Sequence, residues 1–149
     1  MSQQTESILN SVLIDMARSL LQYVAESWPW VRGDAQSVEE QVLVIAARQR
    51  QDVADIAALL TKREHYIDFG SFPTEYTDLQ FLALSTLFEW LHNSQATVLA
   101  SIQTGLQKVR DAGDSEAAEL LTAVETRQQE AATALKELEQ QLSGSSAPA

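Results

Sequence analysis

The most constraining feature of this sequence is a recurrence of apolar residues at alternating steps of three and four, which indicates amphipathic helices. In the first segment, about residues 5–27, the recurring positions are Leu9, Leu13, Met16, Leu20 and Tyr23. Three later segments share this spacing and cover about residues 37–63, 77–112 and 114–142. Because the spacing gives each helix one apolar face, we predict an all-α fold of four long helices.

The breaks between these segments have recognisable chemistry. Pro29 follows the first segment, and proline both lacks a backbone N–H and disfavours helical geometry in the residue before it. Ser37 and Thr77 each stand three residues before a Glu or Gln, the pattern of a capping box at a helix start. Gly113 is suited to a left-handed helix cap, and the last helix then starts at Asp114 or Ser115.

Helices of similar length favour a four-helix bundle, in which the short links make two antiparallel hairpins. The link between the second and third helices, about residues 64–76, is the only long internal connection. It could cross the whole bundle or form a compact loop. We predict a single domain over residues 1–142 and expect the small polar tail, residues 143–149, to be disordered.

Composition removes several classes of function. The chain has 149 residues, 45% hydrophobic, which is typical of one globular domain. Its formal charge of −11 opposes binding to nucleic acid or to anionic lipid surfaces. It has no cysteine, and its longest apolar run, residues 42–47, is too short to cross a bilayer. We therefore expect a soluble cytoplasmic protein without nucleic acid or membrane partners.

Two hairpins of long helices with a long middle connection resemble the ferritin-like superfamily over about residues 5–142. The resemblance implies a di-iron site in the core. That site takes one glutamate from each of two helices and a Glu-x-x-His pair from each of the other two. In the second helix, however, Gln49 and Asp52 have the spacing of that pair, and in the fourth helix Gln128 and Ala131 do. We therefore expect no working di-iron centre and no cofactor.

The single Glu-x-x-His of the chain is Glu89 to His92 in the third helix. With Phe88 and Leu91 on the apolar face, Glu89 should point away from the core and His92 should flank it. The alternative to a metal-free protein is an iron or manganese site built from Asp15, Asp52, Glu89 and His92. We predict no catalytic residues, because the chain lacks a glycine-rich phosphate loop, a nucleophile motif and a histidine pair at zinc spacing.

Three glutamines, Gln49, Gln95 and Gln128, interrupt otherwise apolar helix faces. A buried amide must be hydrogen-bonded, so we expect them to bond to one another, to water or to a neighbouring charge. Their predicted role is to set the helix register, as single polar residues do in coiled coils. The alternative is a polar ligand cavity in the core.

Asp52 lies on the same face as Gln49, and an unpaired buried carboxyl would have a raised pKa. The candidate partners for this carboxylate are Arg48 and His92. Arg127, by contrast, is interspersed among glutamates of the last helix, a pattern typical of a solvated face.

Five aromatic residues lie in the connections and off the apolar faces: Trp28, Trp30, Phe69, Phe72 and Tyr76. They either cap the ends of the bundle or form an interaction patch that a homodimer would bury. The predicted function is a non-enzymatic, self-associating structural or protein-interaction module. The alternatives are a carboxylate-rich metal protein and a small-ligand binder.

Overall fold

The computed structural model describes residues 2–26, 36–72 and 84–145, and the regular secondary structure in these ranges is entirely helical. The helices are, in chain order, α1 (Ser2–Ala17), α2 (Leu20–Glu26), α3 (Gln36–Lys62), α4 (Leu84–Asp111) and α5 (Ser115–Ser145). The predicted all-α class is confirmed. Within the same ranges, no helix combines the length and the apolar character that crossing a membrane requires.

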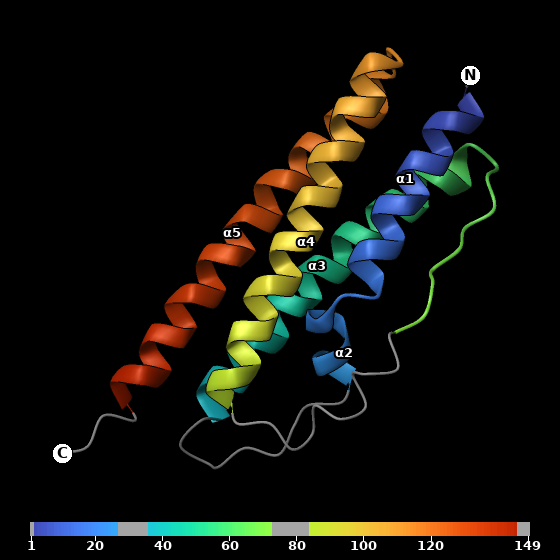
Figure 1. Cartoon of the computed structure of the whole chain (residues 1–149). Helices are drawn as coiled ribbons and strands as arrows, with labels where there is room; N and C mark the ends of the chain where they lie inside the picture. Colours follow the sequence, from blue (N-terminus) through green and yellow to red (C-terminus); the bar gives the residue numbers. More distant parts are fainter. Residues whose placement is uncertain (1, 27–35, 73–83, 146–149) are drawn as a thin grey trace.

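The long helices lie side by side along one axis (Figure 1). α1 packs against α3 and α4, and α5 packs against the same two helices. α1 and α3 run in opposite directions, as do α4 and α5, whereas α3 and α4 both run from the lower to the upper end in Figure 1. α2 lies below α1 in that view and also contacts α3 and α4.

The segment that follows α3 runs back along the first two helices. In chain order, its contacts join Asp68 to Asn10, Gly70 to Ile14 and Phe72 to Tyr23. The first is a pair of hydrogen bonds of 3.0 and 3.1 Å, and the last is an edge-to-face ring contact with centroids 5.2 Å apart. At Gly70, φ is 71° and a Cβ would lie 2.9 Å from Ile14, so only glycine fits. Residues 65–72 therefore travel toward the end of the molecule at which α4 begins (Figure 1).

The first predicted helix is interrupted, so the expectation of one helix through residue 27 is wrong. α1 ends at Ala17 and α2 starts at Leu20. At the break, the Leu20 N–H donates to Ser94 Oγ (3.1 Å) and the Gln22 N–H donates to Ser19 Oγ (3.4 Å). These side chains supply acceptors for N–H groups at the start of a helix, which lack intrahelical partners.

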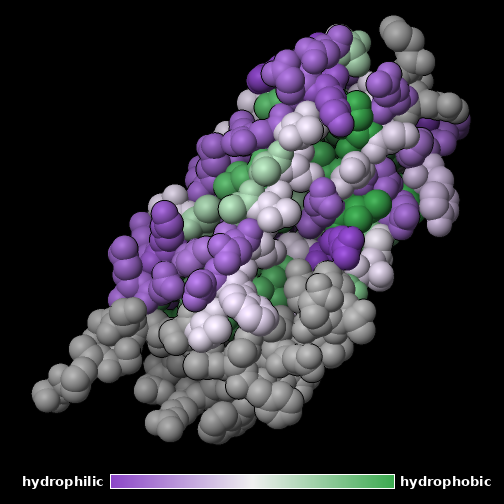
Figure 2. Space-filling view, viewed as in Figure 1, coloured by the Kyte–Doolittle hydropathy of each residue, from purple (hydrophilic) through white to green (hydrophobic). Residues whose placement is uncertain are grey.

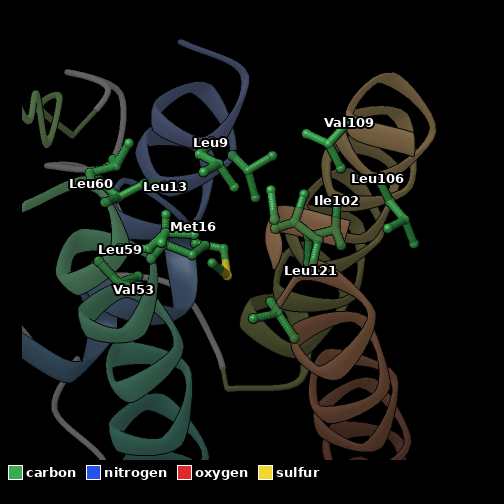
Figure 3. Packing of buried hydrophobic residues seen from close by; sticks show 14 of the residues in the cluster. Leu9, Leu13, Met16, Val53, Leu59, Leu60, Ile102, Leu106, Val109 and Leu121 are labelled. Atoms are coloured by element: carbon green, nitrogen blue, oxygen red, sulfur yellow. The ribbon is translucent and has the colours of Figure 1, made fainter. Parts of the chain in front are cut away.

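The apolar core consists of two clusters, one toward each end of the molecule. The cluster at the upper end includes Leu9, Leu13 and Met16 of α1 together with residues of α3, α4 and α5 (Figure 3). The lower cluster is built around Phe88 and Leu91 of α4, with residues of α2, α3 and α5. Nearly every predicted apolar-face residue with a described side chain is buried.

The ends of the last two helices follow the local sequence signals. Gly113 has φ of 74°, and the Asp114 N–H donates to the Val109 carbonyl (3.0 Å), as in a left-handed helix cap. Asp114 then caps α5, because its Oδ1 accepts from the Ala117 N–H (3.1 Å). α5 continues through Ser145, three residues beyond the predicted end. The predicted start at Thr77 lies outside the described residues.

Candidate functional site: a buried polar layer

A layer of buried polar side chains separates the two apolar clusters. On α3 the layer lies between Ala46 of the lower cluster and Val53 of the upper cluster, and on α4 it lies between Leu91 and Val98. Its members have exposed fractions of 4% or less, and they are Ser19, Gln22, Gln49, Asp52, Gln95 and Gln128. The layer thus joins α3, α4 and α5 to α2 and to the short break between α1 and α2.

Gln49 is the centre of this layer. Its Oε1 accepts from Ser19 Oγ (3.0 Å) and from Gln22 Nε2 (2.9 Å). Its Nε2 donates to Gln95 Oε1 (3.1 Å) and to Gln128 Oε1 (2.9 Å). An amide side chain has two acceptor positions and two donor hydrogens, so every position of Gln49 is used.

The other amides complete the network. Gln95 Nε2 donates to the backbone carbonyl and the Oε1 of Gln128, at 3.0 and 2.9 Å. Gln22 Nε2 also donates to the Ala46 carbonyl (2.8 Å), and Gln128 Nε2 donates to Asp52 Oδ2 (2.7 Å). The three glutamines singled out in the sequence therefore bond to one another and, through Gln128, to a buried charge.

Asp52 is the only acidic member of the layer, and it is 1% exposed. Its Oδ1 accepts from Arg127 Nε (2.5 Å), and the guanidinium also lies 3.7 Å from Asp55. Burial raises the pKa of Asp52, and the hydrogen bonds from Gln128 and Arg127 oppose this shift. The partner of Asp52 is thus Arg127, and the candidates Arg48 and His92 were wrong.

Arg127 itself is only 44% exposed at its side chain, because it reaches inward from the surface of α5. Arg127 is exposed, as its place on the solvated face predicts, but its guanidinium also bonds to the buried Asp52. The physical reason is that an arginine next to a buried position can lay its stem along the helix and place its guanidinium on a buried carboxylate.

The candidate metal ligands Asp15, Asp52, Glu89 and His92 do not form one group. Asp15 Oδ2 accepts from Ser101 Oγ (2.6 Å), and His92 Nε2 lies 3.0 Å from Glu139 Oε1. Glu89 is exposed, and Asp52 bonds to Arg127 and Gln128. In the described ranges, no group of three or more histidine, aspartate or glutamate side chains is arranged to hold a metal ion. The four candidate ligands are therefore not brought together among the described residues.

The aromatic residues predicted to form an interaction patch are described in part. Phe69 is 52% exposed, whereas Phe72 is half-buried against Tyr23. Trp90 (43% exposed) and Tyr66 (84% exposed) are further aromatic side chains at the surface. Three of the predicted positions lie outside the described residues: Trp28, Trp30 and Tyr76.

An ion-pair cluster connects the C-terminal end of α3 to the start of α5. Arg63 donates two hydrogen bonds to the carboxylate of Asp114, at 2.7 and 3.0 Å, and a third to Glu116 at 3.1 Å. The Arg63 and Asp114 side chains are each 17% exposed. The bonds from Arg63, and the Ala117 N–H, hold the pKa of Asp114 below its usual range.

Replacing Asp114 with asparagine should lower the free energy of unfolding at neutral pH by about 1–3 kcal/mol, because hydrogen bonds to a charged group are lost while a capping side chain is kept. The unfolded chain takes up a proton at Asp114 near the ordinary pKa of 3.8, before the folded chain does. The extra stability of the wild type over Asp114→Asn is therefore fully present above about pH 3.8. It is lost as the pH falls through the lower pKa that Asp114 has in the folded state.

Urea unfolding of both proteins from neutral pH down to about pH 2.5 measures this difference at each step. Glu119→Gln, at an exposed position of the same helix, removes one negative charge without breaking a described contact and serves as control. A stability difference between Asp114→Asn and wild type that does not change with pH would contradict the ion-pair explanation.

Sequence patterns missed two residues of the polar layer, Ser19 and Gln22, and the arginine that pairs with it, Arg127. The first two were hidden because an uninterrupted helix gives a different register from the observed α1–α2 break. A serine inside a predicted helix was the available signal, since serine competes for backbone hydrogen bonds. No signal in the sequence separates Arg127 from the other charged residues of α5.

No protein family model, curated protein or solved structure matches this chain.

Proposed function

We propose that the chain is a four-helix bundle of two antiparallel hairpins with ferritin-like connectivity, and that a glutamine layer replaces the di-iron centre. α1 and α2 together form one corner of this bundle. The contacts of α1 and α5 with α3 and α4 support this arrangement, as does the path of residues 65–72 along α1. The proposed role is a non-enzymatic protein-interaction module that associates with a second copy of itself.

The observation that carries the interaction role is a surface around the end of α1, which we call the Arg18 face. Arg18 borders two hollows: one of about 520 Å³ shared with Asp15 and Trp90, and one of about 290 Å³ shared with Phe69. Both aromatic side chains are about half exposed. Tryptophan and arginine are enriched among the residues that dominate binding energy in protein interfaces.

The charges of the Arg18 face favour a second copy as the partner. Asp15 and Arg18 are three residues apart at the C-terminal end of α1, and both line the larger hollow. In a two-fold symmetric contact the same patch meets itself, so Arg18 of each copy can face Asp15 of the other. Much of the molecular surface in Figure 2 is hydrophilic, and its apolar residues lie in interrupted patches. A small contact area between two copies is consistent with such a surface.

Sedimentation velocity across the micromolar range at physiological salt tests the proposal. We expect the wild type to form a dimer and Phe69→Glu and Trp90→Glu to shift it toward monomer, because each variant places a charge in the contact. Val44→Glu is the matched control, because Val44 is 52% exposed, like Phe69, but lies on α3.

Circular dichroism melting checks that each variant is folded. A wild type that stays monomeric throughout, or a control variant that dissociates as much as the other two, would overturn the proposed self-association.

A further inference from the structure

A pocket of about 460 Å³ lies between α3 and α5, next to the polar layer. Gln49, Asp52 and Gln128 of the layer line it, together with the apolar residues Ile45, Ala131 and Ala134. The two alanines are only half-buried and leave space that larger side chains would fill. The volume is within the range of about 300–1,000 Å³ common for small-molecule sites.

The buried lining of the pocket can accept further hydrogen bonds, but it has no free donor on Gln49. Gln49 has no free hydrogen-bonding position, and Gln128 Oε1 already accepts two bonds. The carboxylate of Asp52, in contrast, has about four acceptor positions. Two of them are used, by Arg127 Nε and Gln128 Nε2. A molecule that enters the pocket therefore meets a buried carboxylate with acceptor capacity left.

The charges around the pocket favour a cation. Three carboxylates line it, from Asp52, Asp55 and Glu130, against two guanidinium groups, from Arg48 and Arg127. The net charge of the lining is therefore negative. A ligand anion would have to approach three carboxylates, whereas a ligand cation gains from the same field.

Arg127 shows how such a cation would be held. Its side chain is 44% exposed, yet its guanidinium bonds to a carboxylate that is 1% exposed. The guanidinium thus covers Asp52 from the rim of the pocket, within 3.7 Å of Asp55. A guanidinium group is also less strongly hydrated than an ammonium group, which lowers the free-energy cost of moving it from water to a buried site.

We propose that the α3–α5 pocket binds a small organic cation that carries planar N–H donors, such as a guanidinium group, with Asp52 as its charge partner. Arg127 is the internal competitor that the ligand displaces toward Asp55 and solvent. This binding role goes beyond the proposed self-association, because Asp52 and Arg127 line the α3–α5 pocket, whereas Asp15, Arg18 and Trp90 line a hollow that includes residues of α4.

Isothermal titration calorimetry with agmatine, which carries a guanidinium and an ammonium group, is the test. Arg127→Gln should bind agmatine about tenfold more tightly than the wild type, because it removes the competitor for a charged hydrogen bond. Asp52→Asn should weaken binding about tenfold or more, because it removes the charged acceptor of that hydrogen bond. Ala134→Leu should abolish binding by filling the pocket without changing a charge.

Glu119→Gln controls for nonspecific attraction of cations to this acidic chain, because it changes the net charge by the same amount as Asp52→Asn at an exposed site of α5. Circular dichroism establishes that each variant is folded. Amide chemical shifts at Ala131 and Ala134, followed by NMR in the wild type and in Arg127→Gln, locate the bound agmatine without using the Asp52 variant.

The proposal is overturned if neither the wild type nor Arg127→Gln binds agmatine, or if Glu119→Gln weakens binding as much as Asp52→Asn does. It is also overturned if Ala134→Leu binds as well as the wild type. A monomeric protein that still binds agmatine would reject the proposed self-association and leave this inference standing.

Discussion

Replacing Gln49 with leucine should lower the free energy of unfolding by about 2–5 kcal/mol, although the side chain keeps nearly the same volume. The hydroxyl hydrogen of Ser19 loses its acceptor, although Ser19 Oγ still accepts from the Gln22 N–H, and the Oε1 of Gln95 loses its donor. Each buried polar group left without a partner costs about 1–3 kcal/mol. Urea unfolding at neutral pH measures the difference.

The double variant Gln49→Leu with Gln95→Leu separates lost hydrogen bonds from altered packing. Because these two amides bond to each other, removing both should cost less than the sum of the single changes. Strictly additive costs, or a single Gln49→Leu variant as stable as the wild type, would mean that the network does not hold the helices together.

Phe88→Ala should destabilise the chain by about 3–5 kcal/mol, the usual cost of removing a large aromatic side chain from a core. Phe88 is fully buried, and it packs in the lower apolar cluster with residues of α2, α3 and α5. Thermal and urea unfolding both report this change.

The neighbouring residue provides the control. Glu89 is exposed on the same turn of α4, so Glu89→Ala should change the stability by no more than about 0.5 kcal/mol. Equal melting temperatures for wild type and Phe88→Ala would show that α4 presents a different face to the core.

The polar layer also bears on the iron alternative. A ferritin-like site needs carboxylates and histidines that face one point, but the layer presents four amides and one carboxylate that is already bonded to an arginine and an amide. Metal content measured by mass spectrometry after incubation with ferrous iron tests this directly. Two metals per chain, lost in an Asp52→Ala and Glu89→Ala double variant, would restore the iron hypothesis.

The layer explains why a core can contain several polar residues. A buried amide is costly when unpaired and gives little net stability when paired, but it penalises every helix register that breaks its bonds. Because Gln49 bonds to four residues outside its own helix, a shift of α3 by one turn would leave several donors and acceptors unsatisfied. Register specificity is therefore the role we expect for these glutamines.

The sequence by itself determined the features that depend on neighbours along the chain. Apolar spacing determined the helical class and nearly all the buried faces, because a helix brings residues three and four apart onto one side. The cap at Gly113 and the capping of α5 by Asp114 were likewise local, since both depend on the preferences of the residues there.

Only the tertiary structure decided the features that depend on other helices. The break at Ser19 has partners on α3 and α4. The link after α3 follows α1 through contacts such as the hydrogen bonds between Asp68 and Asn10, which are 58 positions apart in the chain. Arg127 differs from the other charged residues of α5 because the packing of α3 on α5 places Asp52 beside it, and the sequence does not show this. A buried polar group must be paired, but periodicity in one helix does not specify which distant side chain will meet it.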